Sequence, residues 1–123
     1  MPRIRPHGPR AFVPLPSAAL HVLLAIGADE RHGYAIMGEV ERVTGGAVRM
    51  GPGTLYGTIK RLLDDGLIEE CGERSDPVRA DQRRRYYRVT ALGRTAVASE
   101  VERLQSMINR TGVRTWAAGQ QAR

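Results

Sequence analysis

The stretch GPGTLYGTIKRLLDDGLIEE (residues 51–70) decides the fold that we predict for this chain. Its apolar residues recur at the spacing of one face of an amphipathic helix: Leu55, Ile59, Leu62 and Leu63. Pro52 suits the first turn of a helix because its missing N–H costs no hydrogen bond there, and Gly66 ends the pattern. We therefore expect a helix from about Pro52 to Asp65, followed by a short extended segment.

The exposed side of this helix is small, hydroxylic and basic near its N-terminus. On a helical wheel, Gly57, Lys60 and Arg61 lie opposite the apolar stripe, with Thr54 and Tyr56 on its flanks. Small residues let a helix lie deep in a groove, hydroxyls bind phosphates or base edges, and a helix N-terminus attracts phosphate. An ordinary amphipathic helix with a flexible start is the alternative interpretation, and this helix alone does not decide between the two.

Several kinds of site are not expected in this chain. Gly51 and Gly53 begin a G-x-G pattern, but Tyr56 stands where a nucleotide-binding loop has its third glycine, and no predicted strand precedes it. The single cysteine, Cys71, excludes an internal disulfide and fits a reducing compartment. We expect no metal site, because the histidines share no ligand spacing with it: His7, His21 and His32. No nucleophile paired with a base is apparent, so we predict neither a cofactor nor an enzyme.

The neighbouring segments complete one predicted domain in a chain of 123 residues. Residues 1–16 are rich in proline and read as a flexible basic N-terminal arm. The elements expected after the arm are a helix from Ser17 as N-cap to about Ala28, a connection over residues 27–33, a helix from Gly33 to Val43, the helix described above, strands over residues 67–74 and 83–90, and a helix over residues 91–110 capped by Thr90. This order predicts a mainly α fold with a small β-hairpin.

Three short helices followed by a hairpin are the parts of a winged helix-turn-helix, which we assign to residues 17–90. In that fold the third helix enters the major groove of DNA, and the hairpin reaches the neighbouring backbone. The last helix carries apolar residues spaced four, three and four apart, the seam of a dimerisation helix: Val97, Val101, Leu104 and Ile108. Residues 111–123 contain no convincing element and are expected to form a flexible tail.

Positive charge is concentrated in the predicted hairpin. The chain has 19 Lys and Arg against 13 Asp and Glu, for a net charge of +6. Residues 74–88 hold six arginines against two aspartates, whereas residues 17–73 hold five cations against nine anions. A basic segment on an acidic body suits a polyanion, so we predict phosphate contacts by Arg79, Arg83, Arg84 and Arg85. A solvated edge strand, protected from aggregation by its charges, is the alternative interpretation.

The apolar run SAALHVLLAIGA (residues 17–28) follows basic residues, as in a secretory signal, but His21 interrupts it and its periodicity is that of an amphipathic helix. No stretch is long enough to span a bilayer. We therefore expect a cytoplasmic protein without a membrane partner.

Two stretches, HGYAIMGEVERVTGGAVRMGPGTLYGTIKRLLDDGLIEE (residues 32–70) and RRRYYRVTALGR (residues 83–94), resemble the PadR family of transcriptional regulators. The resemblance covers about Leu20 to Leu104. It implies a homodimeric winged-helix repressor that dimerises through its C-terminal helix and often through its first helix, here Leu20 and Leu24. The tip of the predicted hairpin, DPVRAD, is longer than is common in the family. Trp116 lies in the tail, so the drug-binding role of tryptophans in some members is not transferred to it.

The predicted function is sequence-specific binding of double-stranded DNA by a homodimeric repressor on a roughly palindromic site. The resemblance also implies release by a small-molecule effector or another signal, whose identity the sequence does not give. The alternative is a winged-helix module that senses a ligand or meets an acidic protein without reading DNA. The predicted DNA-binding residues before and in the third helix are Arg49, Gly51, Pro52, Gly53, Thr54, Tyr56, Gly57, Lys60 and Arg61.

Overall fold

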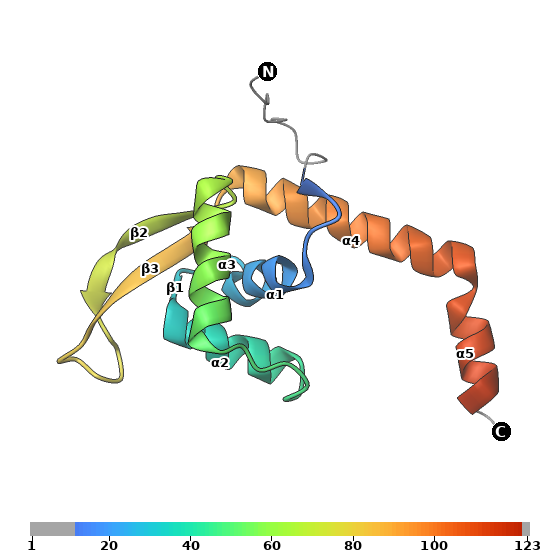
Figure 1. The fold of residues 1–123 in the computed structure, drawn as a ribbon, viewed down its shortest axis with the longest axis horizontal. Helices are drawn as coiled ribbons and strands as arrows, with labels where there is room; N and C mark the ends of the chain where they lie inside the picture. The colour runs from blue at the N-terminus through green and yellow to red at the C-terminus, as the bar shows by residue number, and fades with distance from the viewer. Residues whose placement is uncertain (1–11, 122–123) are drawn as a thin grey trace, which may run out of the picture.

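The computed structural model describes residues 12–121 and shows a helical body with a small sheet on one side (Figure 1). The elements are α1 (Ser17–Ile26), β1 (Arg31–His32), α2 (Gly33–Val43), α3 (Pro52–Asp64), β2 (Ile68–Ser75), β3 (Arg83–Val89), α4 (Ala91–Thr111) and α5 (Val113–Gln121). The predicted fold class, a mainly α winged helix-turn-helix, is confirmed. No helix in the described range is both long and apolar enough to cross a bilayer.

The core forms where α1, α2 and α3 meet the sheet. The predicted stripe of α3 points into it: Leu55, Ile59 and Leu62 are at most 2% exposed, and Leu63 packs at its edge. Burying several such side chains, each contributing about 1.5–3 kcal/mol, holds α3 in place. The opposite side of α3 is thereby fixed as the outward side.

The sheet has three antiparallel strands in the order β1-β3-β2, one more than the sequence predicts. Residues 27–33 were expected to form a connection only, but Arg31 and His32 pair with Tyr87 and Tyr86 of β3. A strand of two residues has no alternation to detect, so only its partner reveals it. The hairpin of β2 and β3, with its connecting residues 76–82, is called the wing below.

α4 leaves the body as a long helix, and α5 turns away from its far end (Figure 1). The predicted cap is present, because the Thr90 hydroxyl accepts the Gly93 N–H at 3.0 Å and donates to the Gly66 carbonyl at 2.7 Å. α5 forms where the sequence predicts no regular element. Gly112 separates the two helices in a left-handed conformation with φ of 62°, the geometry in which helices commonly end.

The predicted N-terminal arm, residues 1–16, falls partly outside the described residues, which begin at Phe12. Phe12–Pro16, called the N-terminal segment, lies against the core, where Leu15 is 7% exposed. Glu100 of α4, which is 2% exposed and accepts hydrogen bonds from Arg103, lies beside the Leu15 backbone. The prediction of Ser17 as N-cap is wrong, because the helix already includes it and Pro16 takes that position.

Candidate nucleic-acid interface

The N-terminal end of α3 presents an open surface made of small residues. Gly51, Gly53 and Gly57 are exposed, and a Cβ added to any of them would meet no atom of the described chain within 4 Å. Packing within residues 12–121 therefore does not require these glycines, and the space above them is free for an external partner. Gly51 is the N-cap and provides no side-chain acceptor, so the first amides of the helix can bind an anion.

The polar side chains of this end are also exposed. Thr54 and Tyr56 project from the first turns, and Lys60 follows with a side chain that is 80% exposed and an Nζ 3.3 Å from the Asp64 carboxylate. Arg49 precedes the helix, 77% exposed and 3.3 Å from Glu41. Exposed ion pairs of this kind are weak, so both cations can exchange their partner for a phosphate.

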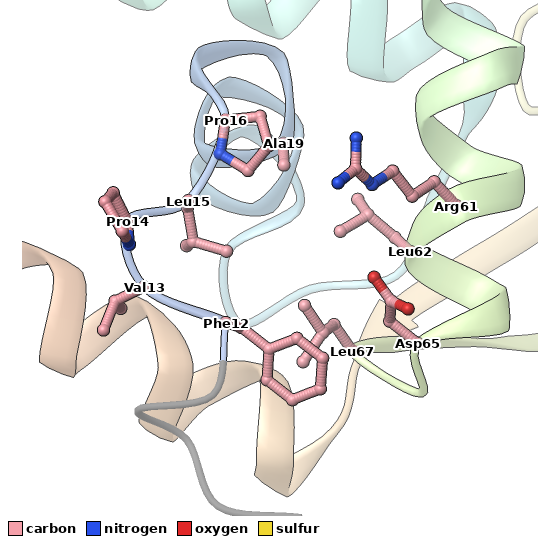
Figure 2. A pocket seen from close by; sticks show the side chains of 10 residues that line it. All are labelled: Phe12, Val13, Pro14, Leu15, Pro16, Ala19, Arg61, Leu62, Asp65 and Leu67. Carbon is pink, nitrogen blue, oxygen red and sulfur yellow. The ribbon is translucent and has the colours of Figure 1, made fainter. Parts of the chain in front are cut away.

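Arg61 lies away from this group. Figure 2 shows its side chain on the flank of α3 that faces the N-terminal segment, beside a pocket of about 190 Å³. Phe12, Leu15 and Leu67 form apolar walls of that pocket, and Asp65 lies near Arg61 in it. The helical wheel places Arg61 near Lys60, but it does not show that the N-terminal segment comes close to this flank.

A basic groove joins α3 to the wing. It has a volume of about 240 Å³ and is called the helix–wing groove; its lining residues are His32, Gly33, Tyr56, Arg83, Arg84, Arg85 and Tyr87. Tyr56 lies across the start of α2, so closely that a Cβ on Gly33 would be 2.7 Å from its hydroxyl oxygen. Three of the seven lining residues are arginines, and none of the described lining residues is acidic. The groove can therefore attract a phosphate backbone beside the exposed end of α3.

The consecutive arginines of β3 have two different environments. Arg83 is exposed and donates to the Glu73 carbonyl at 3.0 Å, and the side chain of Arg85 is 69% exposed with Glu70 at 4.0 Å. Arg84 is instead half-buried, and its Nε donates to Asp76 at 3.1 Å and its Nη2 to Gln82 at 2.7 Å. Successive side chains of a strand lie on opposite faces of the sheet, so Arg84 lies on the other face from Arg83 and Arg85. Arg79, at the wing tip, is exposed as well.

Tyr34 and His32 belong to this region although neither was predicted to act in it. Tyr34 is 63% exposed at the start of α2, with the Arg84 guanidinium 5.5 Å from its ring centroid. His32 is buried and its Nδ1 accepts the Ala35 N–H at 3.1 Å, so it caps α2. Burial lowers the pKa of His32. The sequence signal that could have identified both residues is the run HGY (residues 32–34), in which a polar residue directly precedes a helix.

The predicted dimerisation residues are only partly available to a second chain. Val101 and Leu24 are exposed, by 37% and 52%, whereas Leu20 and Val97 pack partly against the core. Leu104 and Ile108 are half-buried. Met107 on α4 and Trp116 on α5 add large exposed apolar side chains, 48% and 57% exposed, that the sequence did not single out for dimerisation.

Comparison with known proteins agrees with this architecture. The family model described as "Transcriptional regulator PadR-like family" matches residues 22–99. The chain is 34% identical over 88 residues to the transcriptional regulator Rv3488 of Mycobacterium tuberculosis, which covers 72% of this chain and 76% of that protein. It is also 32% identical over 93 residues to an uncharacterized 37.1 kDa protein in transposon TN4556 of Streptomyces fradiae. That match covers 76% of this chain and 24% of that protein, so the chain spans about a quarter of its length.

Solved structures share the fold. RosR from H. salinarum superposes with a TM-score of 0.62 and 26% identity, over 90% of this chain and 97% of that one. PadR from Bacillus subtilis, solved in complex with operator DNA, gives a TM-score of 0.57 and 18% identity over 68% of this chain and 45% of that one. The resemblance described from residues 32–70 and 83–94 is confirmed, since the family model spans well over half of the chain. The chain belongs to the PadR-like family of transcriptional regulators.

Proposed function

We propose that this chain is a sequence-specific DNA-binding repressor that acts as a homodimer in the cytoplasm. Residues 17–90 would bind DNA, with α3 in the major groove and the wing on the adjacent backbone. The observation that supports this most directly is the combination of an uncovered glycine-rich start of α3 with the arginine-lined helix–wing groove beside it. Bacillus subtilis PadR, which shares the fold, was solved with operator DNA, and this supports the same class of partner here.

Within this proposal the residues divide by role. Thr54, Gly57 and Lys60 face the base edges, because they lie on the outward side of α3. Tyr56, Arg83 and Arg85 contact phosphates across the helix–wing groove, with Arg79 doing so at the wing tip. Arg84 is assigned to holding the wing, because its guanidinium is already bound by Asp76 and Gln82. Arg61 is not assigned a base contact, since it lies by the N-terminal segment.

Dimerisation is proposed through α4, extended by α5. The apolar side chains that support it are exposed in the single chain: Leu24, Val101, Met107 and Trp116. Two copies would place two α3 helices on half-sites about one helical turn of DNA apart. A small molecule that prefers a dimer with differently spaced α3 helices would release the DNA, and we propose such an effector without assigning its chemistry.

The test measures, by fluorescence anisotropy, how tightly the protein binds labelled DNA duplexes from the region upstream of its own gene. We expect saturable binding that weakens steeply with salt, since each phosphate contact contributes about 0.9 to the slope of log affinity against log salt. K60A should relax the preference for the best duplex over a scrambled one. Replacing Arg83 and Arg85 together by glutamine should weaken binding to both duplexes alike and lower the salt slope.

The absence of binding to any upstream duplex at low salt would contradict the proposal. It would favour the alternative function, a winged-helix module whose basic groove meets an acidic protein. In that case the same double variant in the wing should abolish capture of the protein partner.

A further inference from the structure

Asp76 is a buried carboxylate in the most basic part of the chain. It lies at the end of β2, where the wing tip begins, and is 5% exposed. A buried anion costs free energy unless it is hydrogen-bonded, and an anion near a DNA-binding surface also repels phosphate. Its presence in the wing therefore requires a compensating role.

One oxygen of Asp76 shapes the wing tip. Oδ1 accepts the backbone N–H groups of Val78 at 2.8 Å and Arg79 at 3.1 Å, which bends the chain in an Asx turn. The Asp76 N–H donates in turn to the Gln82 carbonyl at 2.7 Å and closes the loop at its base. The two backbone hydrogen bonds are the main reason that the pKa of Asp76 is lowered to about 2. The group is thus an anion at neutral pH.

The other oxygen faces the helical body. Oδ2 accepts Nε of Arg84 at 3.1 Å and lies 3.9 Å from Nε2 of His32. His32 is the last residue of β1 and also the cap of α2, so one carboxylate lies between the wing tip and the start of the helix-turn-helix. The Arg84 guanidinium, 5.5 Å from the Tyr34 ring, extends the same link along α2.

We propose that Asp76 is a positioning residue for DNA binding, which fixes the wing tip to the start of α2 and so sets the distance from the wing arginines to α3. This inference rests on the DNA-binding function proposed above. A tip that is ordered before binding does not lose conformational entropy when its side chains meet phosphates. Without Asp76, Arg79 and the residues beside it would have to be ordered by the DNA.

The sign of the effect on affinity separates this role from simple electrostatics. Removing a negative charge from a phosphate-binding surface should by itself tighten binding. If Asp76 positions the wing, its removal should weaken binding instead. Asp81, an exposed aspartate in the same tip, offers a matched control because D81A removes the same kind of carboxylate from the same segment.

The experiment compares wild type, D76A and D81A by fluorescence anisotropy on the upstream duplex, together with hydrogen exchange of the Val78 and Arg79 amides. For D76A we expect binding weaker by about 5- to 150-fold, the effect of leaving the side chains of Val78 and Arg79 to be ordered by the DNA, and faster exchange of both amides. Its salt slope should also fall, because a mobile tip makes fewer phosphate contacts. D81A should bind at least as tightly as wild type with unchanged exchange.

D76A that binds as tightly as wild type, with both amides still protected, would overturn the proposal. If D76A lacks a cooperative thermal transition, R84Q and R85Q provide the comparison, since each removes one positive charge from β3. Faster exchange of the Val78 and Arg79 amides is then expected in R84Q alone, and equal exchange in the two variants overturns the proposal. Should wild type bind no DNA, the proposed function fails, while the exchange data still test whether Asp76 holds the wing.

Discussion

Gly33 is the position where a single methyl group should change DNA binding without changing the fold. A Cβ there would lie 2.7 Å from the Tyr56 hydroxyl oxygen and 2.9 Å from two of its ring carbons, whereas ordinary contacts are 3.4–4 Å. The three atoms closest to the added Cβ all belong to the far end of one side chain. In G33A we therefore expect Tyr56 to swing away while α2 and α3 keep their places.

The size of the effect follows from that displacement. The ring end must move by about 0.7 Å, which exceeds the roughly 0.5 Å spread of distances over which an O–H···O hydrogen bond is maintained. A phosphate contact of the Tyr56 hydroxyl would then be lost. A hydrogen bond to a charged group contributes about 1.5–3 kcal/mol, so the affinity of each half-site should fall by about 10- to 150-fold.

The assay is fluorescence anisotropy with four proteins: wild type, G33A, Y56A and the double variant. Because the methyl group acts only through the tyrosine, G33A should weaken binding strongly in the wild type and have little effect in the Y56A background. G38A controls for helix propensity, since a Cβ at Gly38 meets no atom of residues 12–121 within 4 Å and should stabilise α2 by about 0.5–1 kcal/mol.

Either of two results would refute this reasoning. G33A could bind DNA as tightly as wild type, which would mean that the Tyr56 hydroxyl makes no hydrogen bond to DNA that contributes to affinity. Alternatively, G33A could lose the same factor with and without the tyrosine, which would show that the methyl group disturbs the interface by another route.

Three further predictions concern stability, pH and assembly. G93A should destabilise the fold by about 1–3 kcal/mol or more in thermal melts, because its Cβ would collide with the backbone carbonyl of Leu67; an unchanged melting temperature would contradict this. The pKa of His32 is lowered by burial, so its contribution to stability is complete above about pH 6.5 and is lost as pH falls through the folded-state value. H32N keeps a capping oxygen and should lack that part of the pH dependence in urea titrations, whereas equal slopes would count against the assignment. V101E should shift the protein toward monomers in sedimentation experiments at unchanged helicity, and a persistent dimer would exclude α4 as the interface.

Periodicity along the chain was enough to predict α1 to α4 and the two long strands. The bounds of α2 agree with the sequence, and α3 ends within one residue of the predicted position, because glycine or proline ends an apolar stripe at both places. α5 was missed, since Gly112 interrupts the helical pattern and the following residues form no strong apolar face. The exposed start of α3 was also predictable, because burial of its leucine stripe fixes which side faces outward.

The sequence by itself therefore determined the fold class, the family, and the exposed end of α3, all of which depend on residues close together in the chain. Only the tertiary structure decided which arginines of β3 are exposed and which is held by a buried carboxylate. Arg83, Arg84 and Arg85 are identical as letters, but Arg84 alone is bound by the buried Asp76. It likewise decided that β1 pairs with β3 and that Arg61 faces the N-terminal segment. Most of these contacts join segments that are far apart in the sequence. Whether an arginine stabilises the fold or is exposed to a partner depends on which residues the fold places next to it.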